Sequence, residues 1–289
     1  MELYPLRVFL TVATEKSFSR AAEKLHRTQP AISLALQRLE GDLGERLIDR
    51  SAKDLVLTDA GRTVLEYARR FENLNEELQD SLAELRDNSA GRLSIGANES
   101  TTLYLLRHIE RYRKLFPKVK VEVRRSLSSR IPSEIVDGNL ELGVISYDPH
   151  DDRLKSTVIF TDALAFVVSP RHPLAAKKQL MLRDLGGETF IAHNVVSPYR
   201  EAVVREFQRQ GVQLNMPVEM PTVETIRRLV QADLGVAFLP KMCVQQDLEA
   251  GSLVAVKVQD MQMERKIYLL RPSRRAMSYA AAAFLELLG

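Results

Sequence analysis

The chain has 289 residues, which corresponds to about two domains of roughly 150 residues each. Hydrophobic residues make up 45% and charged residues 27% of it, which argues against long disordered, collagenous or low-complexity segments. The single cysteine, Cys243, excludes a disulfide within the chain and fits a reducing compartment. Because no run of about 18 apolar residues occurs and the charged N-terminal stretch is unlike a secretory signal, we expect a cytoplasmic protein without a membrane segment. The net charge of +3 is too small to indicate a nucleic-acid partner by itself.

Residues 17–43 have the spacing of two short helices joined by a tight turn. Thr28 is placed to cap the second helix, and Pro30 lies in its first turn, where a missing N–H costs little. The apolar residues of the second helix recur at steps that predict one continuous buried stripe: Ile32, Leu36, Leu39 and Leu43.

The opposite face of this second helix is predicted to be polar. It carries Gln29 in the first turn, then Ser33, Gln37 and Arg38, and such side chains in the first half of a helix can meet base edges in the major groove. Leu34 is apolar yet points outward, so it either touches a thymine methyl group or packs on a neighbouring element. An ordinary helical hairpin with a solvated face is the alternative to a DNA-reading helix.

A short wing and a long helix are predicted next. The short apolar runs Leu47–Ile48 and Leu55–Leu57 bracket the polar turn 51–54, which indicates a small β-wing. From 62 to 90 there is no Gly or Pro, and apolar residues recur every three or four positions: Tyr67, Phe71, Leu74, Leu78, Leu82 and Leu85. A long helix with one apolar seam has to bury that seam, and a second copy of the chain is the simplest partner.

From Arg92 onward, strand-like apolar runs alternate with helical stretches. This alternation predicts βαβ units and a parallel sheet. Pro170 and Pro272 each follow a hydrophobic strand, which is where two strands crossing between subdomains would end. From the residues we therefore predict an N-terminal segment of helices with a β-wing, followed by a region of the α/β fold class.

The segment 3–65 resembles the winged helix-turn-helix of the LysR-type transcriptional regulators. The motifs that carry this resemblance are Phe9, Ser17–Ala22, Thr28–Ser33, Leu39–Glu40, Leu43–Gly44, Leu47–Arg50 and Leu57–Gly61. The resemblance continues through Phe116–Pro117, Asp137–Gly138, Leu142–Val144, His172–Leu174 and Leu234–Pro240.

The resemblance implies three parts. They are a winged helix-turn-helix DNA-binding domain over 1–62, a dimerising linker helix over 63–90, and an effector-binding domain over 91–289. The last is expected to have the two-subdomain α/β fold of periplasmic binding proteins, with subdomain I at about 92–163 and 270–289 and subdomain II at about 164–269. It also implies a homodimer, usually a homotetramer, that binds double-stranded DNA at an interrupted palindrome and alters the access of RNA polymerase.

The DNA contacts are carried over from the family position by position. The recognition-helix residues expected near bases or phosphates are Thr28, Gln29, Pro30, Ser33, Leu34 and Arg38. Arg50 and Lys53 match wing positions where a basic side chain approaches the backbone or minor groove. The family often has a polar or basic residue at position 34 and Arg at position 53, and Lys lacks the guanidinium fork of Arg, so the base preference stays open.

The effector contacts are predicted around a helix start and on the facing wall. Hydroxyls and free N–H groups at a helix N-terminus suit a small anion such as a carboxylate. The predicted helix starts contribute Asn98, Ser100, Thr101 and Thr222, and Asn194 is expected on the facing wall. The resemblance implies effector positions at Ser100, Ser128 and Ser146. Plain N-capping is the alternative for Ser100 and Thr222. Arg124 and Arg125 lie near the predicted mouth but are interpreted as a solvated strand end.

The motifs of common enzymes and cofactor sites are absent from the sequence. There is no Walker loop, G-x-G-x-x-G, H-E-x-x-H, C-x-x-C or G-x-S-x-G, and the five histidines lack metal-ligand spacing. We therefore expect no catalytic residues, no metal and no cofactor, and a ligand-responsive DNA-binding regulator. The alternatives are the same regulator controlled by a protein partner or by nothing, an enzyme tethered to a helix-turn-helix, and a solute-binding transport component.

Overall fold

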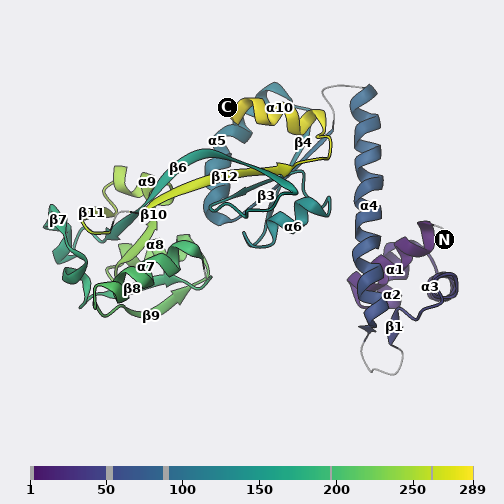
Figure 1. The fold of residues 1–289 in the computed structure, drawn as a ribbon, viewed down its shortest axis with the longest axis horizontal. Helices are drawn as coiled ribbons and strands as arrows, with labels where there is room; N and C mark the ends of the chain where they lie inside the picture. Colours follow the sequence, from purple (N-terminus) through teal and green to yellow (C-terminus); the bar gives the residue numbers. More distant parts are fainter. Residues whose placement is uncertain (1–2, 50–54, 87–90, 196, 262, 289) are drawn as a thin grey trace. The chain divides into compact units, whose positions relative to one another are not determined.

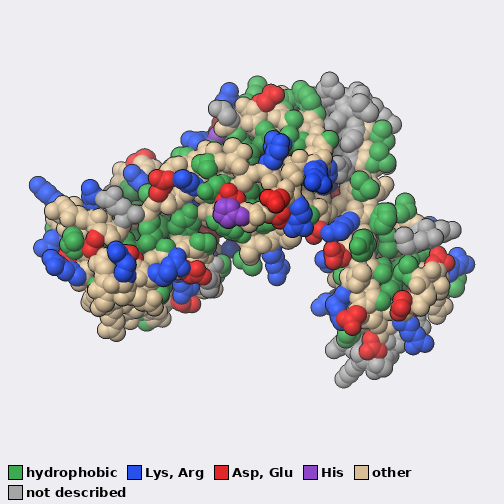
Figure 2. Space-filling model, in the orientation of Figure 1, with side chains coloured by type: hydrophobic (Ala, Val, Ile, Leu, Met, Phe, Trp, Pro, Cys, Tyr) green, Lys and Arg blue, Asp and Glu red, His purple; other side chains and the backbone are tan. Residues whose placement is uncertain are grey.

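The computed structural model describes residues 3–49, 55–86, 91–195, 197–261 and 263–288. Contacts divide the chain into an N-terminal unit, Met1–Arg86 with Asp137–Asn139, and a C-terminal unit, Asp87–Val136 with Leu140–Gly289. Figure 2 shows Lys and Arg side chains interspersed with Asp and Glu over the drawn face, in keeping with the small net charge. Among the described residues, no helix combines the length and apolarity needed to cross a bilayer.

The N-terminal unit is a three-helix domain with a wing and a long helix (Figure 1). Its elements are α1 Leu3–Glu15, α2 Phe18–Lys24, α3 Gln29–Leu43, the antiparallel strands β1 Ile48–Asp49 and β2 Val56–Leu57, and α4 Asp59–Arg86. Phe9, Ile32 and Leu36 are completely or almost completely buried in its core. A Cβ on Gly61 would lie 2.0 Å from the carbonyl oxygen of Leu47, so only glycine lets α4 begin this close to the wing.

The predicted buried stripe of α3 is one residue shorter than expected. Ile32, Leu36 and Leu39 are at most 1% exposed, whereas Leu43 is 36% exposed. The helix ends there because Gly44 adopts the left-handed conformation, with φ of 71°. Ala35, which was not predicted, fills the stripe instead.

The apolar seam of helix α4 is exposed to solvent in the described part of the chain. The exposed seam residues are Tyr67, Phe71, Leu74, Leu78 and Leu82, and each is between 41% and 60% exposed. The side chain of the sixth predicted member, Leu85, lies outside the described part of the helix. An apolar stripe of this size on an otherwise charged helix indicates a surface that is covered in the assembled protein.

The first subdomain of the C-terminal unit is built on three parallel strands. β3 Arg92–Ala97 lies between β4 Lys120–Arg125 and β5 Leu142–Ile145. The helices of this subdomain are α5 Glu99–Leu115, α6 Ile131–Val136 and α10 Tyr279–Leu288. Tyr112 and Phe284 are fully buried between α5 and α10, with their rings edge-to-face.

The second subdomain has parallel strands β8 Thr189–His193 and β9 Asn215–Met220 at one side. Its other elements are β7 Gln179–Leu180, β10 Ala237–Pro240, β11 Val254–Val258, α7 Pro198–Arg209, α8 Val223–Gln231, α9 Lys241–Glu249 and the short 3-10 helices η1 Pro173–Ala176 and η2 Leu182–Leu185. Its core gathers Phe166, Phe190 and Phe207.

Two long antiparallel strands, β6 Leu154–Val168 and β12 Glu264–Pro272, run through both subdomains (Figure 1). At one end β12 pairs with β5, and at the other β6 pairs with β10 and β11. The sheet is therefore mixed rather than all parallel, because the chain crosses between subdomains along these two strands. The prediction of two crossing strands ending near Pro170 and Pro272 is confirmed.

Candidate functional site

The recognition face of α3 is exposed as predicted. Gln29, Pro30 and Arg38 are exposed, Leu34 is 50% exposed, and Ser33 is half-buried on the flank. Thr28 lies at the N-cap, where its backbone carbonyl accepts from the Ile32 N–H, and its hydroxyl makes no capping hydrogen bond. The wing residues Arg50 and Lys53 lie outside the described residues.

One contact connects this face to the first helix of the motif. The hydroxyl of Ser19 on α2 donates to Oε1 of Gln29 at 3.4 Å, which is long for such a bond. Within the N-terminal unit, the face thus combines a buried apolar underside with side chains that make few contacts of their own. It is the arrangement by which a helix-turn-helix enters the major groove.

The C-terminal unit contains a cavity of about 860 Å³ that is lined by both subdomains. Four predicted effector residues line it: Asn98, Ser100, Ser128 and Ser146. Its apolar wall includes Leu164, Phe190, Val203, Leu214, Met216, Phe238 and Leu239. Polar groups at one end and an apolar wall at the other suit a small amphipathic ligand.

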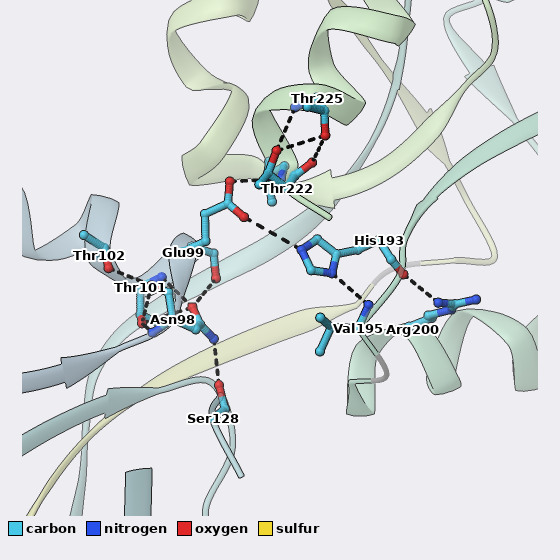
Figure 3. A network of polar contacts seen from close by, with 12 residues as sticks. Asn98, Glu99, Thr101, Thr102, Ser128, His193, Val195, Arg200, Thr222 and Thr225 are labelled. Atoms are coloured by element: carbon cyan, nitrogen blue, oxygen red, sulfur yellow. Dashed lines mark hydrogen bonds and ion pairs between the residues drawn. The ribbon is translucent and has the colours of Figure 1, made fainter. Parts of the chain in front are cut away.

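The polar end of the cavity is a hydrogen-bond network centred on Asn98 (Figure 3). The Asn98 carboxamide donates to the Ser128 hydroxyl at 2.7 Å and accepts from the Ser100 hydroxyl at 3.0 Å. It also accepts from the Thr101 backbone N–H at 2.9 Å, which caps α5. The Ser128 hydroxyl proton therefore points away from Asn98 and can meet a ligand.

Three predicted effector residues do not line the cavity. Thr101 is completely buried behind it, where its hydroxyl donates to the Val144 carbonyl at 2.8 Å. The Thr222 hydroxyl caps α8 by accepting from Thr225 N–H, so the capping alternative holds there. Asn194 is exposed beyond the strand end. These three therefore do not belong to the cavity lining, and their contact with an effector stays a prediction.

Sequence reasoning missed Arg265, the buried cation at the base of the cavity. Arg265 is 3% exposed and forms an ion pair with Asp162 at 3.4 Å. Its guanidinium also donates to the Ser100 hydroxyl and lies 5.6 Å from the ring centre of Tyr199. A basic residue near the beginning of a long strand gives no periodicity signal, and its partners Ser100 and Asp162 lie far away in the sequence.

Besides the bond from Arg265 to Ser100, further hydrogen bonds join the two subdomains across the cavity. The Tyr199 hydroxyl donates to the Ser146 carbonyl at 2.7 Å, and burial raises the pKa of this phenol. The Val223 N–H at the start of α8 donates to Glu99 Oε1 at 3.0 Å. These bonds hold the two walls of the cavity against each other, so opening the cavity requires breaking them.

Cys243 is buried and is not one of the residues that line the cavity. Burial raises the pKa of the Cys243 thiol to about 12, so this cysteine is uncharged and unreactive in the folded chain. Among the residues that the structure describes, no three metal-ligating side chains come together. The arrangement can bind a ligand and transmit its presence to both subdomains.

A winged helix-turn-helix with a free polar face, followed by an α/β unit with a ligand cavity, defines a DNA-binding transcriptional regulator. Residues 3–62 match the family described as bacterial regulatory helix-turn-helix protein, lysR family, and residues 86–289 match the LysR substrate binding domain. The chain belongs to the LysR family. Family membership confirms the predicted fold class and the prediction of a regulator rather than an enzyme.

Individual relatives agree with this assignment. The chain is 33% identical to a protein of Cyanophora paradoxa named "Probable RuBisCO transcriptional regulator", over 98% of this chain and 90% of that protein. Full-length CbnR complexed with its target DNA has the same fold, with a TM-score of 0.78, 20% identity and coverage of 100% and 99% of the two chains. The regulatory domain of Synechocystis CcmR in complex with 2-PG matches 68% of this chain and 95% of its own, with a TM-score of 0.62 and 20% identity.

Proposed function

We propose that this chain controls transcription in response to a small anionic effector bound in the cavity between its two subdomains. The observation that carries the proposal is the polar end of the cavity, where Asn98, Ser128 and the buried Arg265 face an apolar wall. A ligand with one anionic group and a compact carbon skeleton fits both surfaces.

The described lining of the cavity carries three guanidinium groups, of Arg125, Arg200 and Arg265, and one carboxylate, of Glu99. Arg265 is paired with Asp162, and Arg200 is paired with Glu219 outside the cavity. Arg125, at the exposed end of β4, lines the cavity and has no ion pair within the described part of the chain. An unpaired guanidinium at the rim supplies the bidentate donors that a carboxylate or phosphate prefers.

The DNA-binding half of the proposal rests on the exposed face of α3. We assign the DNA contacts to Thr28, Gln29, Pro30, Ser33, Leu34 and Arg38 on the recognition helix and to Arg50 and Lys53 in the wing. The exposed seam of α4 supports a homodimer, which presents two recognition helices to the two halves of a palindromic site. Assembly into a homotetramer and an effect on RNA polymerase complete the proposal.

The proposed mechanism is a shift between two arrangements of the paired C-terminal units. An effector that holds the cavity closed favours one arrangement, which changes the spacing of the winged domains on DNA and the bend between them. Because coupling is reciprocal, operator DNA has to change the effector affinity by the same factor as the effector changes the DNA affinity.

Ligand-dependent thermal stabilisation tests the effector half. The first compounds to screen are 2-PG, which the CcmR neighbour binds, and other small carboxylates and phosphates. A ligand that binds only the folded state raises the melting temperature. At a free concentration of 100 times its Kd, it adds about 2.7 kcal/mol to the free energy of unfolding. The first DNA to test is the promoter of RuBisCO genes, for which the Cyanophora relative is named.

The double variant Ser100→Ala/Ser128→Ala separates a ligand site from a structural network. We expect it to stay folded and to bind the anion at least about tenfold more weakly by calorimetry, since it loses two cavity hydroxyls. Ser133→Ala, an exposed serine on α6 outside the cavity, serves as the matched control. An unchanged binding isotherm for the double variant contradicts the site, and stabilisation by a protein partner alone favours the regulator without a small effector.

A further inference from the structure

His193 and Glu99 face each other across the cavity without forming a hydrogen bond (Figure 3). His193 ends β8 in the second subdomain, and Glu99 begins α5 in the first. Their Nε2 and Oε2 atoms are 3.7 Å apart, which is beyond hydrogen-bond distance. Both side chains line the cavity.

The other side of the imidazole ring shows which protonation state the structure holds. The Val195 backbone N–H donates to Nδ1 of His193 at 3.1 Å. Since Nδ1 accepts this bond, the neutral ring carries its proton on Nε2, towards Glu99. A second proton has to go onto Nδ1, and it breaks the bond from Val195.

Three charged groups face this ring, each from a different element. Glu99 lies on α5, Arg125 at the end of β4, and Arg200 on α7, where it is paired with Glu219 and donates to the His193 carbonyl. Burial lowers the pKa of His193, and the two guanidinium groups act in the same direction, while Glu99 opposes them. The neutral imidazole is therefore the favoured form when the cavity holds no anion.

Only one of the two Glu99 carboxylate oxygens accepts a hydrogen bond within the described residues. Its Oε1 accepts from Val223 N–H, while its buried Oε2 has no hydrogen-bond partner. A buried carboxylate oxygen without a donor is costly, so a donor that moves within reach is strongly favoured. The nearest donor is Nε2 of His193, 3.7 Å away in the opposite subdomain.

We propose that the proton is a second ligand of this cleft: an anion bound beside Arg125 draws a proton from solvent onto His193, and the imidazolium closes onto Glu99 Oε2. The inference rests on the proposed function, because it takes an anion to be the effector. The anion offsets the charge of Arg125, and the new ion pair then links the two subdomains more firmly than the neutral ring does.

The sign of the pH dependence follows from linkage. In the anion-free chain, the pKa of His193 is lowered, so acidification places a charge beside Arg125 and Arg200 and loosens the closed cavity. With the anion bound, the protonated ring is favoured, so affinity for the anion rises as the pH falls through the range in which His193 titrates.

The first experiment titrates His193 in the full chain without any ligand. Selective ¹³C labelling of the five histidines, with His193→Gln for assignment, gives the midpoint by NMR. We expect Arg125→Gln to raise the midpoint, because it removes the charge that an anion would offset, and Glu99→Gln to lower it. Arg171→Gln, an exposed cation away from the cavity, is the control and leaves it unchanged. If Arg125→Gln leaves the midpoint of His193 where it was, the inference is overturned.

The second experiment counts protons during binding. Calorimetry of 2-PG in two buffers of different ionisation enthalpy gives the proton uptake, and subtracting the value for His193→Gln removes the ionisation of 2-PG itself. Greater uptake in the wild type supports the inference, and binding with equal uptake in both overturns it while leaving the proposed function intact. Failure of 2-PG and other small anions to bind counts against the proposed function, and the ligand-free titration still decides the coupling between Arg125 and His193.

Discussion

In the N-terminal unit, the side chains that we assign to DNA stand on an exposed helix face, whereas in the C-terminal unit the side chains around the cavity are bonded to one another. Gln29 has one long contact with Ser19, and Arg38 is exposed. By contrast, Asn98 bonds to three neighbouring residues, and Arg265 is buried against Asp162.

This difference in internal bonding determines whether a substitution in a site changes binding alone or also the stability of the fold. The side chains of a face that makes few internal contacts can be replaced without loss of stability, because their main contacts are with the binding partner. A bonded network carries stability and function together, so changing one member disturbs both. The predictions below measure this contrast.

The largest effect is expected at Arg265. Replacing it in Arg265→Met leaves the Asp162 carboxylate buried with its guanidinium partner gone, and we expect a loss of about 3–5 kcal/mol in the free energy of unfolding. Urea denaturation measures the loss. Arg209→Met, which breaks an exposed pair with Glu206, is the matched control and should cost at most about 1 kcal/mol.

A second variant tests the cause of that loss. In Arg265→Met/Asp162→Leu both charges are removed, so most of the stability should return if the uncompensated carboxylate is responsible. Equal losses in Arg265→Met and Arg209→Met would show that the buried network does not carry the stability that we assign to it.

The next effect is expected on the α4 seam, an exposed surface that we propose to pack against a second chain. Leu78→Glu places a charge in the seam, and the lost burial of about 1.5–3 kcal/mol should weaken self-association at least about tenfold. Analytical ultracentrifugation over a range of concentrations measures this. Glu76→Gln, on the opposite side of the helix, is the control, and equal association of both variants would refute a dimer through this seam.

Most of the fold could be predicted from local sequence signals. The end of the second helix near residue 43, the wing and the long helix α4 follow from residue types at fixed spacing. The mixed sheet could not be predicted in the same way. The direction of β6 relative to β12 is a property of strand pairing over a separation of about a hundred residues, and an apolar run carries no record of its partner.

The site residues likewise fall into those that local periodicity predicts and those that only the tertiary fold brings together. The outward face of α3 follows from helical periodicity, so its exposed residues were predicted correctly. Around the cavity, Ser100 was predicted from a helix start together with the resemblance and Ser128 from the resemblance alone, and the groups that set the charge of the cavity were missed or discounted. Arg265, Glu99 and Arg125 come from a strand, a helix start and a strand end, and only the tertiary fold brings them to one cavity.

The smallest effect on the folded chain, and the sharpest on recognition, is expected at Gln29. Because its side chain is exposed, Gln29→Ala should change the free energy of unfolding by less than about 0.5 kcal/mol. It should also remove about 1–3 kcal/mol of discrimination between the operator and unrelated DNA. Fluorescence anisotropy on an operator found by footprinting upstream of the chain's own gene measures both affinities.

Arg50→Ala should instead weaken binding to all sequences and reduce the salt slope by about 1, as loss of a phosphate contact does. If neither variant differs from the wild type, α3 and the wing do not read DNA in the way proposed, and the contrast between a free face and a bonded network loses its functional meaning.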